Sequence, residues 1–135
     1  MSQQHILIVD DDASLRRVIQ VQLEHEGYAV STAASGPEAL QILGNTVQDL
    51  VITDLRMPGM SGIELLRQIR ADHPGVAVII ITAYGSREIA VEATKSGTYD
   101  YIMKPANPDA LRLIVSRALE HLGLRGEEHT SSFKG

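Results

Sequence analysis

The hydrophobic residues of the chain follow two different periods. Short apolar runs rich in β-branched residues, which are typical of buried strands, recur along the sequence. Between these runs, apolar residues return every three or four positions, as they do on one face of a helix. This pattern predicts strands over residues 5–9, 28–33, 49–54, 76–82 and 99–103. It predicts helices over residues 13–26, 35–44, 61–70, 86–96 and 107–122.

Capping residues support the starts of the predicted helices. Asp12 stands directly before the first helix, where its side chain can accept a hydrogen bond from a free backbone N–H group. Ser35 and Glu38 have the spacing of a capping box at the start of the second helix, and Ser61 and Glu64 repeat it at the third. These signals place helix starts where the hydrophobic pattern changes period.

The alternation of strand and helix predicts an α/β fold with one parallel sheet of five strands and five helices covering both faces. Residues 76–82 form the most apolar run, so we expect them to be a central strand buried on both sides. Five strands are too few for an eight-stranded barrel, and the short connections favour an open, doubly wound sheet. Residues 123–135 lose the helical period, so we expect a domain over residues 1–122 followed by a linker or flexible tail.

Composition narrows the class of protein. The chain has 135 residues, of which 44% are hydrophobic, and this suits a single folded core. The net charge of −5, without a basic cluster, argues against direct nucleic-acid binding. The chain contains no cysteine, which excludes disulfides and thiolate-bound zinc. No apolar run is long enough to span a membrane and the first residues do not form a signal peptide, so we expect a soluble cytoplasmic protein.

Polar residues that could take part in a reaction or bind a ligand end or follow four of the predicted strands. Residues 10–12 are three aspartates directly after the first strand, and Asp54 ends the third. Thr82 ends the fourth strand, and Lys104 follows the fifth. Ligands of an open parallel sheet bind beyond the carboxyl ends of its strands, so we expect these side chains to converge at one edge.

This set of residue types favours a particular chemistry. Clustered carboxylates without soft ligands suit a hard cation such as Mg²⁺, which often bridges to a phosphoryl group. Asp54, alone on its strand, is a candidate nucleophile towards phosphorus, and Lys104 and Thr82 would stabilise the phosphoryl oxygens. Taken singly, each residue has a structural explanation, such as a helix cap, a strand end or a surface lysine. Their joint placement at one edge favours the functional interpretation.

Several motifs together resemble one family. The segments "IVDDD", "VITDLRMPGMSGIELL", "IIITAYG" and "YDYIMKP" closely resemble response-regulator receiver domains of two-component signalling. The resemblance covers residues 5–122 and is strongest to the receivers of nitrogen-regulatory, enhancer-binding transcription activators. It implies a flavodoxin-like sheet with strand order 2-1-3-4-5 and a function as a phosphorelay signalling switch.

The resemblance also implies roles for residues that bind the phosphoryl group and the metal. Asp54 matches the phosphoacceptor. Asp10, Asp11 and Asp54, with the backbone carbonyl of Arg56, match the ligands of Mg²⁺, for which Mn²⁺ would substitute. Lys104 matches the lysine that pairs with the phosphoryl group. Asp54, Lys104 and Thr82 would therefore carry the chemistry.

The remaining implied roles concern the switch. Thr82 matches the hydroxyl that moves to contact the phosphoryl group, and Tyr101 matches the aromatic residue that turns inward when it does. The Lys104–Pro105 bond resembles the family's cis peptide. Ala106 departs from the bulky residue that many receivers carry at this position, which affects packing rather than chemistry.

The resemblance implies partners as well. A sensor histidine kinase would donate the phosphoryl group from a phosphohistidine, and slow self-hydrolysis would follow, so the chain is expected to be a phosphoacceptor signalling domain rather than an enzyme. Phosphorylation would alter the face formed by residues 76–82, 86–96 and 99–103, and so regulate a partner or a C-terminal output domain, most simply one that regulates transcription. A second copy of the chain would contact the face formed by residues 86–96, 99–103 and 107–122.

Three other functions predict different residues. A phosphatase of the haloacid dehalogenase type expects a second acid two residues after the nucleophile, where this chain has Arg56. A flavodoxin-like FMN carrier expects a Ser/Thr/Gly loop after the first strand, where this chain is acidic. A receiver that works only through protein contacts would not need the complete set of acids, Thr82 and Lys104.

Overall fold

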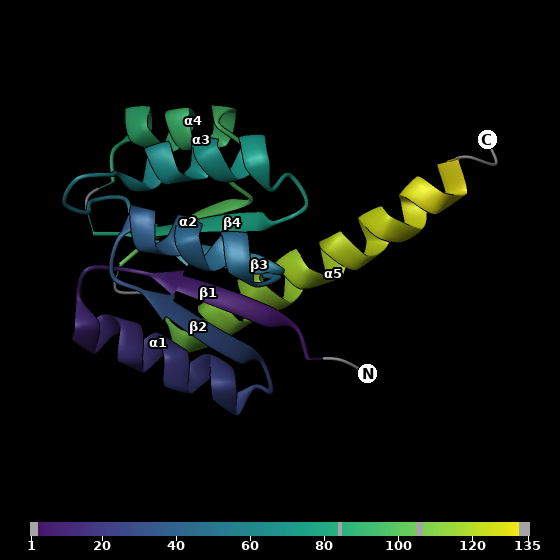
Figure 1. Ribbon diagram of the computed structural model, residues 1–135, viewed down its shortest axis with the longest axis horizontal. Coiled ribbons are helices and arrows are strands. Elements are labelled where there is room, and N and C mark those ends of the chain that lie inside the picture. Colours follow the sequence, from purple (N-terminus) through teal and green to yellow (C-terminus); the bar gives the residue numbers. More distant parts are fainter. Residues whose placement is uncertain (1–2, 84, 105–106, 133–135) are drawn as a thin grey trace.

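Strands and helices alternate along the whole described chain (Figure 1). The computed structural model describes residues 3–83, 85–104 and 107–132, with side chains described up to residue 120. The strands are His5–Val9 (β1), Ala29–Ala33 (β2), Leu50–Thr53 (β3), Ala77–Thr82 (β4) and Asp100–Met103 (β5). The helices are Ala13–His25 (α1), Gly36–Asn45 (α2), Gly62–Asp72 (α3), Arg87–Lys95 (α4) and Pro108–Ser132 (α5). The predicted elements are therefore confirmed, with boundaries that differ by one or two residues except at the end of α5.

The strands form one parallel sheet in the order β2-β1-β3-β4-β5, which confirms the order implied by the resemblance. The register brings the carboxyl ends of the strands to one edge. Val9 at the end of β1 pairs with Thr53 at the end of β3, and Thr82 at the end of β4 pairs with Met103 at the end of β5. The residues that follow these strands therefore meet at the same edge.

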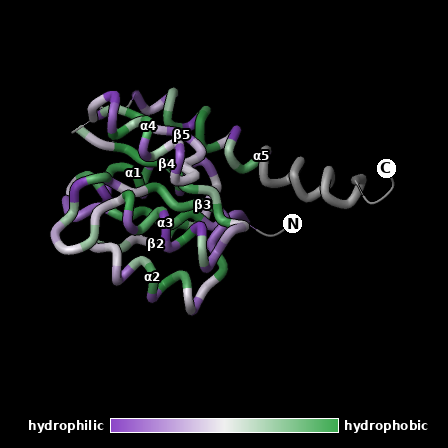
Figure 2. The backbone as a smooth tube through the Cα atoms, turned by 90° about the horizontal axis from the view of Figure 1, so that it is seen from above, coloured by the Kyte–Doolittle hydropathy of each residue, from purple (hydrophilic) through white to green (hydrophobic). Residues whose placement is uncertain are grey.

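Helices cover both faces of the sheet (Figure 1). Helices α2, α3 and α4 pack on one face, against side chains such as Val51 and Val78. Helices α1 and α5 pack on the other, against Ile52 and Ile79. The hydrophobic residues accordingly concentrate along the strands and the inner sides of the helices (Figure 2). All six residues of β4 are buried, as expected for a central strand of a parallel sheet.

The two predicted capping boxes differ in outcome. At the start of α3, Ser61 and Glu64 exchange both side-chain-to-backbone hydrogen bonds, so this capping box is complete. At the start of α2, the Ser35 hydroxyl accepts from the Glu38 N–H, but the Glu38 carboxylate accepts from Ala34 instead of Ser35. In the capping box of α2, the hydrogen bond to the Glu38 carboxylate therefore comes from the residue before the cap.

Helix α5 continues to Ser132, beyond the predicted end at residue 122. Residues 123–132 contain no proline and include leucine, arginine and glutamate, which are good helix formers. The division into a domain over residues 1–122 and a linker stays a prediction, because a helix can itself serve as a linker. Although α5 has 25 residues, neither it nor any other described helix is apolar enough to cross a membrane.

Candidate functional site

A pocket of about 990 Å³ lies at the edge of the sheet where the strands end. Its lining includes Asp10, Asp11, Asp54, Arg56 and Lys104, which come from the segments that follow β1, β3 and β5. The sequence predicted that the aspartates and Lys104 converge, and the structure brings them to one pocket. Thr82, which was predicted to join them, is not among the residues that line it.

Backbone hydrogen bonds that extend the sheet set the positions of these residues. The Asp10 N–H donates to the Ala33 carbonyl over 3.1 Å, and the Asp54 N–H donates to the Val9 carbonyl over 2.9 Å. The Lys104 N–H donates to the Thr82 carbonyl over 2.9 Å. Each of these three side chains therefore projects from the first residue beyond a strand, where the backbone is still hydrogen-bonded to the neighbouring strand or segment.

Three carboxylates lie close together in the pocket. Asp10, Asp11 and Asp54 each offer an oxygen atom, and these atoms lie within 4.8 Å of one another. Asp10 and Asp54 are buried, whereas Asp11 is exposed. Two carboxylate charges at that separation repel by about 3.5 kcal/mol at an effective dielectric constant of about 20. The cluster therefore needs a compensating cation.

Lys104 supplies positive charge to two of the three carboxylates. Its Nζ lies 3.1 Å from Asp10 Oδ2 and 3.1 Å from Asp54 Oδ2, and its side chain is only 18% exposed. Burial lowers the pKa of Lys104, but the hydrogen bonds to Asp10 and Asp54 outweigh this effect, so the pKa lies above its ordinary value. Lys104 therefore remains protonated at neutral pH.

For Asp10, burial has a larger effect on the pKa than the hydrogen bonds do. Burial raises the pKa of its carboxyl, and the hydrogen bonds from the Asp12 N–H and from Lys104 only partly reverse the rise. Lys104 interacts with two carboxylates, whereas Asp10 shares one lysine with Asp54, whose charge also repels it. The ionised form of Asp10 is thus held at a net cost, which a further cation would reduce.

The Asp54 side chain is fixed at both oxygens. Oδ1 accepts from the Leu55 N–H over 2.7 Å, and Oδ2 accepts from Lys104. Helix α3 begins directly against this residue. A Cβ atom on Gly62 would lie 2.2 Å from the Asp54 carbonyl oxygen, so only glycine allows the helix to approach so closely.

The two predicted switch residues, Thr82 and Tyr101, lie on neighbouring strands. Thr82 is fully buried at the end of β4. The Tyr101 hydroxyl on β5 is also buried and has no hydrogen-bond partner among the described residues. A Cβ atom on Gly85 would lie 2.6 Å from this hydroxyl, which places it under the loop between β4 and α4. Burial raises the pKa of Tyr101.

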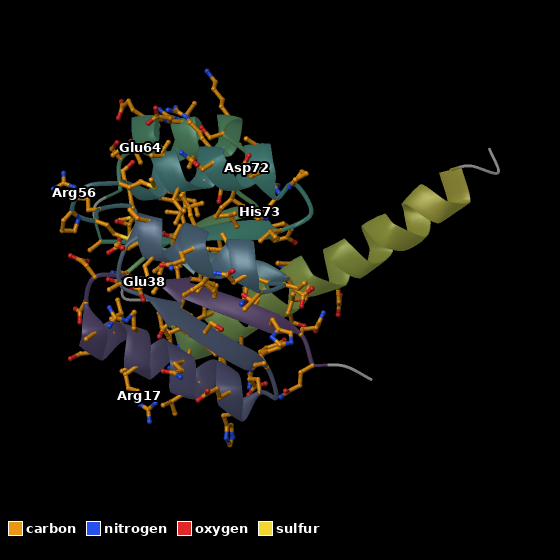
Figure 3. All side chains as sticks on the ribbon, in the orientation of Figure 1. Arg17, Glu38, Arg56, Glu64, Asp72 and His73 are labelled. Atoms are coloured by element: carbon orange, nitrogen blue, oxygen red, sulfur yellow. The ribbon has the colours of Figure 1, made fainter. Side chains whose placement is uncertain are left out.

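Arg56 lies in the loop between β3 and α3 and lines the pocket. Its side chain is exposed and lies at the same end of the molecule as Glu64 (Figure 3). Asp72 and His73, at the end of α3, lie away from that end (Figure 3). The predicted cis bond at Pro105 and the packing at Ala106 fall outside the described residues.

Two contacts at the site were not predicted from the sequence. Asp12 caps α1 as predicted, but its N–H also donates to Asp10 Oδ1 over 2.9 Å. Arg16 donates from Nη1 to the Asp10 carbonyl over 2.5 Å. Its position one helical turn after Asp12 is the signal that could have indicated this contact, because residues four apart share a helix face.

Comparison with known proteins identifies the family. The model of the response regulator receiver domain matches residues 6–116, and the chain belongs to this family. It is thus a receiver domain of two-component signalling, with the function of a regulatory switch. This membership decides against the phosphatase and the FMN carrier.

The similar full-length proteins are transcriptional regulators. The chain is 46% identical to the transcriptional regulatory protein GlrR of Escherichia coli over 116 residues, which cover 86% of the chain and 26% of that protein. It is 46% identical to ZraR of Klebsiella oxytoca over 119 residues, which cover 88% of the chain and 27% of that protein. The chain therefore spans about a quarter of the length of these curated relatives.

Solved structures agree with the fold. A CheY-like receiver domain from Methanospirillum hungatei has a TM-score of 0.89 and 36% identity, and the match covers 92% of this chain and 99% of that chain. NtrX from Brucella abortus has a TM-score of 0.89 and 34% identity, and the match covers 96% of this chain and 29% of that chain. The match therefore spans nearly all of one solved chain and less than a third of the other.

Proposed function

We propose that Asp54 accepts a phosphoryl group with the help of Mg²⁺ and that this event switches the domain between two states. The observation that carries the proposal is the grouping of Asp54 with two further carboxylates and Lys104 in one pocket. The fold positions each of these groups, and the family supplies the reaction class.

The donor set fits a hard divalent cation. Three carboxylate oxygens lie within 4.8 Å of one another, and oxygen atoms are the ligands that Mg²⁺ prefers. Asp10, Asp11 and Asp54, with the backbone carbonyl of Arg56, would hold the cation, and Mn²⁺ would substitute because it prefers similar ligands. When bound, the cation neutralises the charge that develops on the phosphoryl oxygens.

The acceptor step follows from the geometry of Asp54. One of its carboxylate oxygens forms a bond to phosphorus while the P–N bond of a phosphohistidine breaks. The electron pair of that bond stays on the imidazole nitrogen, which takes a proton from solvent. Lys104 is hydrogen-bonded to Asp54 and would transfer this contact to a phosphoryl oxygen.

Dephosphorylation is a separate step that needs only water as the attacking group. Attack of water on phosphorus breaks the bond to Asp54, releases inorganic phosphate and restores the carboxylate. The domain thus catalyses its own phosphorylation and slow dephosphorylation without acting on a separate substrate.

The switch uses the β4–α4–β5 side of the molecule. A phosphoryl group adds a charge of roughly −1.5 to −2 beside Thr82, whose hydroxyl would turn to donate to it. Tyr101 would then adjust, because its hydroxyl lies under the loop that follows Thr82. Helix α4 buries only Ala93 among its described residues, which supports its role as the element that shifts.

The partners follow from this mechanism. A sensor histidine kinase would supply the phosphoryl group in the cytoplasm, where receivers usually act. The similar transcriptional regulators continue well beyond the matched region, so an output domain that regulates transcription would follow α5. The surface of α4, β5 and α5 would contact a second copy, and the receiver itself would not contact DNA.

Intact-mass spectrometry after incubation with acetyl phosphate and Mg²⁺ tests this proposal. We expect the wild-type chain and Asp72→Asn, an exposed acid away from the site, to gain the mass of one phosphoryl group. We expect Asp54→Asn to gain none. A gain that survives in Asp54→Asn would overturn the acceptor assignment, and rapid release of phosphate from many small esters would favour a phosphatase.

A further inference from the structure

Asp10 is held at every polar atom. Its N–H donates to Ala33, and its Oδ1 and Oδ2 accept from the Asp12 N–H and from Lys104. Its carbonyl oxygen accepts from Nη1 of Arg16 over 2.5 Å. The last of these contacts is the one that a side chain of α1 supplies, and the proposed phosphoryl transfer does not use it.

The Asp10 carbonyl belongs to the same planar peptide unit as the Asp11 N–H. A hydrogen bond that fixes this carbonyl therefore fixes the plane from which the Asp11 side chain projects. The Asp11 carboxylate is exposed and makes no hydrogen bond with the described residues. The backbone therefore sets the direction of the Asp11 Cα–Cβ bond, from which the carboxylate extends.

Arg16 is itself firmly placed. Its N–H donates to the Asp12 carbonyl over 3.0 Å in the first turn of α1, and Asp12 caps that helix. The side chain is half-buried, unlike that of Arg17, which is exposed and directed away from the sheet (Figure 3). Of these two adjacent arginines, only Arg16 forms a described hydrogen bond with residues 10–12.

We propose that Arg16 is a positioning residue that holds the Asp10–Asp11 peptide so that the Asp11 carboxylate is preorganised for the divalent cation. It acts through the backbone and touches neither the cation nor the phosphoryl group. This inference rests on the proposed function, because it assigns Arg16 to the same metal site.

The charge of Arg16 makes the proposal predict a particular direction of change in Mg²⁺ affinity. A guanidinium near the site repels a divalent cation, so its removal for electrostatic reasons alone would strengthen Mg²⁺ binding. Loss of positioning would weaken Mg²⁺ binding. The two explanations thus predict opposite changes in one measured constant.

The test is Mg²⁺ titration of the full chain by isothermal calorimetry at fixed ionic strength. We expect Arg16→Gln to raise the Kd for Mg²⁺ by about tenfold or more, the usual effect of losing a contact that orients a metal ligand. Arg17→Gln makes the same charge change on the adjacent residue, and we expect a Kd at or below the wild-type value. Arg16→Lys keeps the charge and one donor group, and we expect an intermediate Kd.

A Kd for Arg16→Gln equal to or lower than that of the wild type would overturn the positioning role. Should Arg16→Gln lack the wild-type circular dichroism spectrum, Arg16→Lys decides alone: a raised Kd supports the role and an unchanged or lowered Kd overturns it. Phosphorylation of Asp54 in the wild type with normal Mg²⁺ binding in both Arg16 variants would defeat this inference only. A wild-type chain that binds no Mg²⁺ would defeat the proposed function and this inference together.

Discussion

Lys104 stands against three carboxylates at the edge of the sheet, and this imbalance is the main feature of the site at the scale of residues. The lysine forms ion pairs with Asp10 and Asp54. Asp11 has no ion pair among the described residues. Burial raises the pKa of Asp10, and the charge of Asp54 adds to this rise. A divalent cation would relieve the imbalance, so the stability of the domain and its metal binding should be linked.

Removal of Asp11 should stabilise the metal-free protein. Asp11→Asn removes one repelling charge without breaking an ion pair, so in EDTA we expect the melting temperature to rise by about 2–5 °C. Mg²⁺ should raise the melting temperature of the wild type and leave that of Asp11→Asn nearly unchanged. Differential scanning fluorimetry measures both, with Asp72→Asn as the control. An equal response of wild type and Asp11→Asn to Mg²⁺ would contradict the assignment.

Lys104 should stabilise the fold in a pH-dependent manner. Lys104→Met leaves two buried carboxylates unpaired, so in EDTA near neutral pH we expect the free energy of unfolding to fall by about 3 kcal/mol. Because the pKa of Lys104 is raised in the folded state, its contribution is complete below the ordinary value of 10.5 and is lost as the pH rises through the folded value. The difference between wild type and variant should therefore shrink in strongly alkaline solution.

Urea denaturation at about pH 8 and at about pH 11.5 measures this difference. The contributions of groups other than Lys104 are common to both proteins and cancel in the comparison. Lys95→Met, an exposed lysine of α4, is the control and should show little change at either pH. A difference that grows with pH would contradict the stated role of Lys104.

Helix α3 shows how a local element positions the acceptor. Its complete capping box starts the helix at Gly62, and Gly62 lies directly against the Asp54 backbone. The hydrophobic period and the capping residues are local, so the sequence predicted this helix and its start. The need for glycine at its first position arises from contact with the backbone of Asp54 and Leu55, just after β3, and no local pattern contains this contact.

Substitution of Gly62 should therefore disturb both stability and phosphorylation. Gly62→Ala places a Cβ atom 2.2 Å from the Asp54 carbonyl oxygen, and we expect a loss of about 2 kcal/mol or more in the free energy of unfolding. We also expect slower phosphorylation by acetyl phosphate. Gly44→Ala in α2 meets nothing within 4 Å and should stabilise the protein by about 0.5–1 kcal/mol. Chemical denaturation of the two variants compares them, and equal stability would refute the close-packing argument.

The whole molecule brings together residues that are far apart in the sequence. The alternation of elements predicted a parallel doubly wound sheet, and the rule that ligands bind at the carboxyl ends of strands predicted which side chains meet. Lys104 and Asp10 are 94 residues apart, so their ion pair depends on the strand order, which the resemblance supplied and the hydrophobic pattern did not. The Arg16 contact depends on a side-chain conformation, which the spacing of Arg16 from Asp12 indicates but does not determine.

At this scale we expect phosphorylation to alter self-association. Each of α4, β5 and α5 carries an exposed apolar side chain, namely Val91, Met103 and Leu113. We expect acetyl phosphate and Mg²⁺ to shift the chain towards a dimer in size-exclusion chromatography with light scattering. Leu113→Asp should remain monomeric, whereas Val47→Asp, an exposed residue before β3, should dimerise like the wild type. Dimerisation of Leu113→Asp at the wild-type level would exclude this face.

The central claim is that the pocket makes an acyl phosphate on Asp54 in the presence of Mg²⁺. Its most direct measurement is the reduction of the phosphorylated chain with borohydride, which converts an acyl phosphate to an alcohol, followed by tandem mass spectrometry of the peptides. We predict a reduced residue at position 54 alone, formed with Mg²⁺ and not in EDTA. Reduction at any other position, or equal reduction in EDTA, would contradict the account.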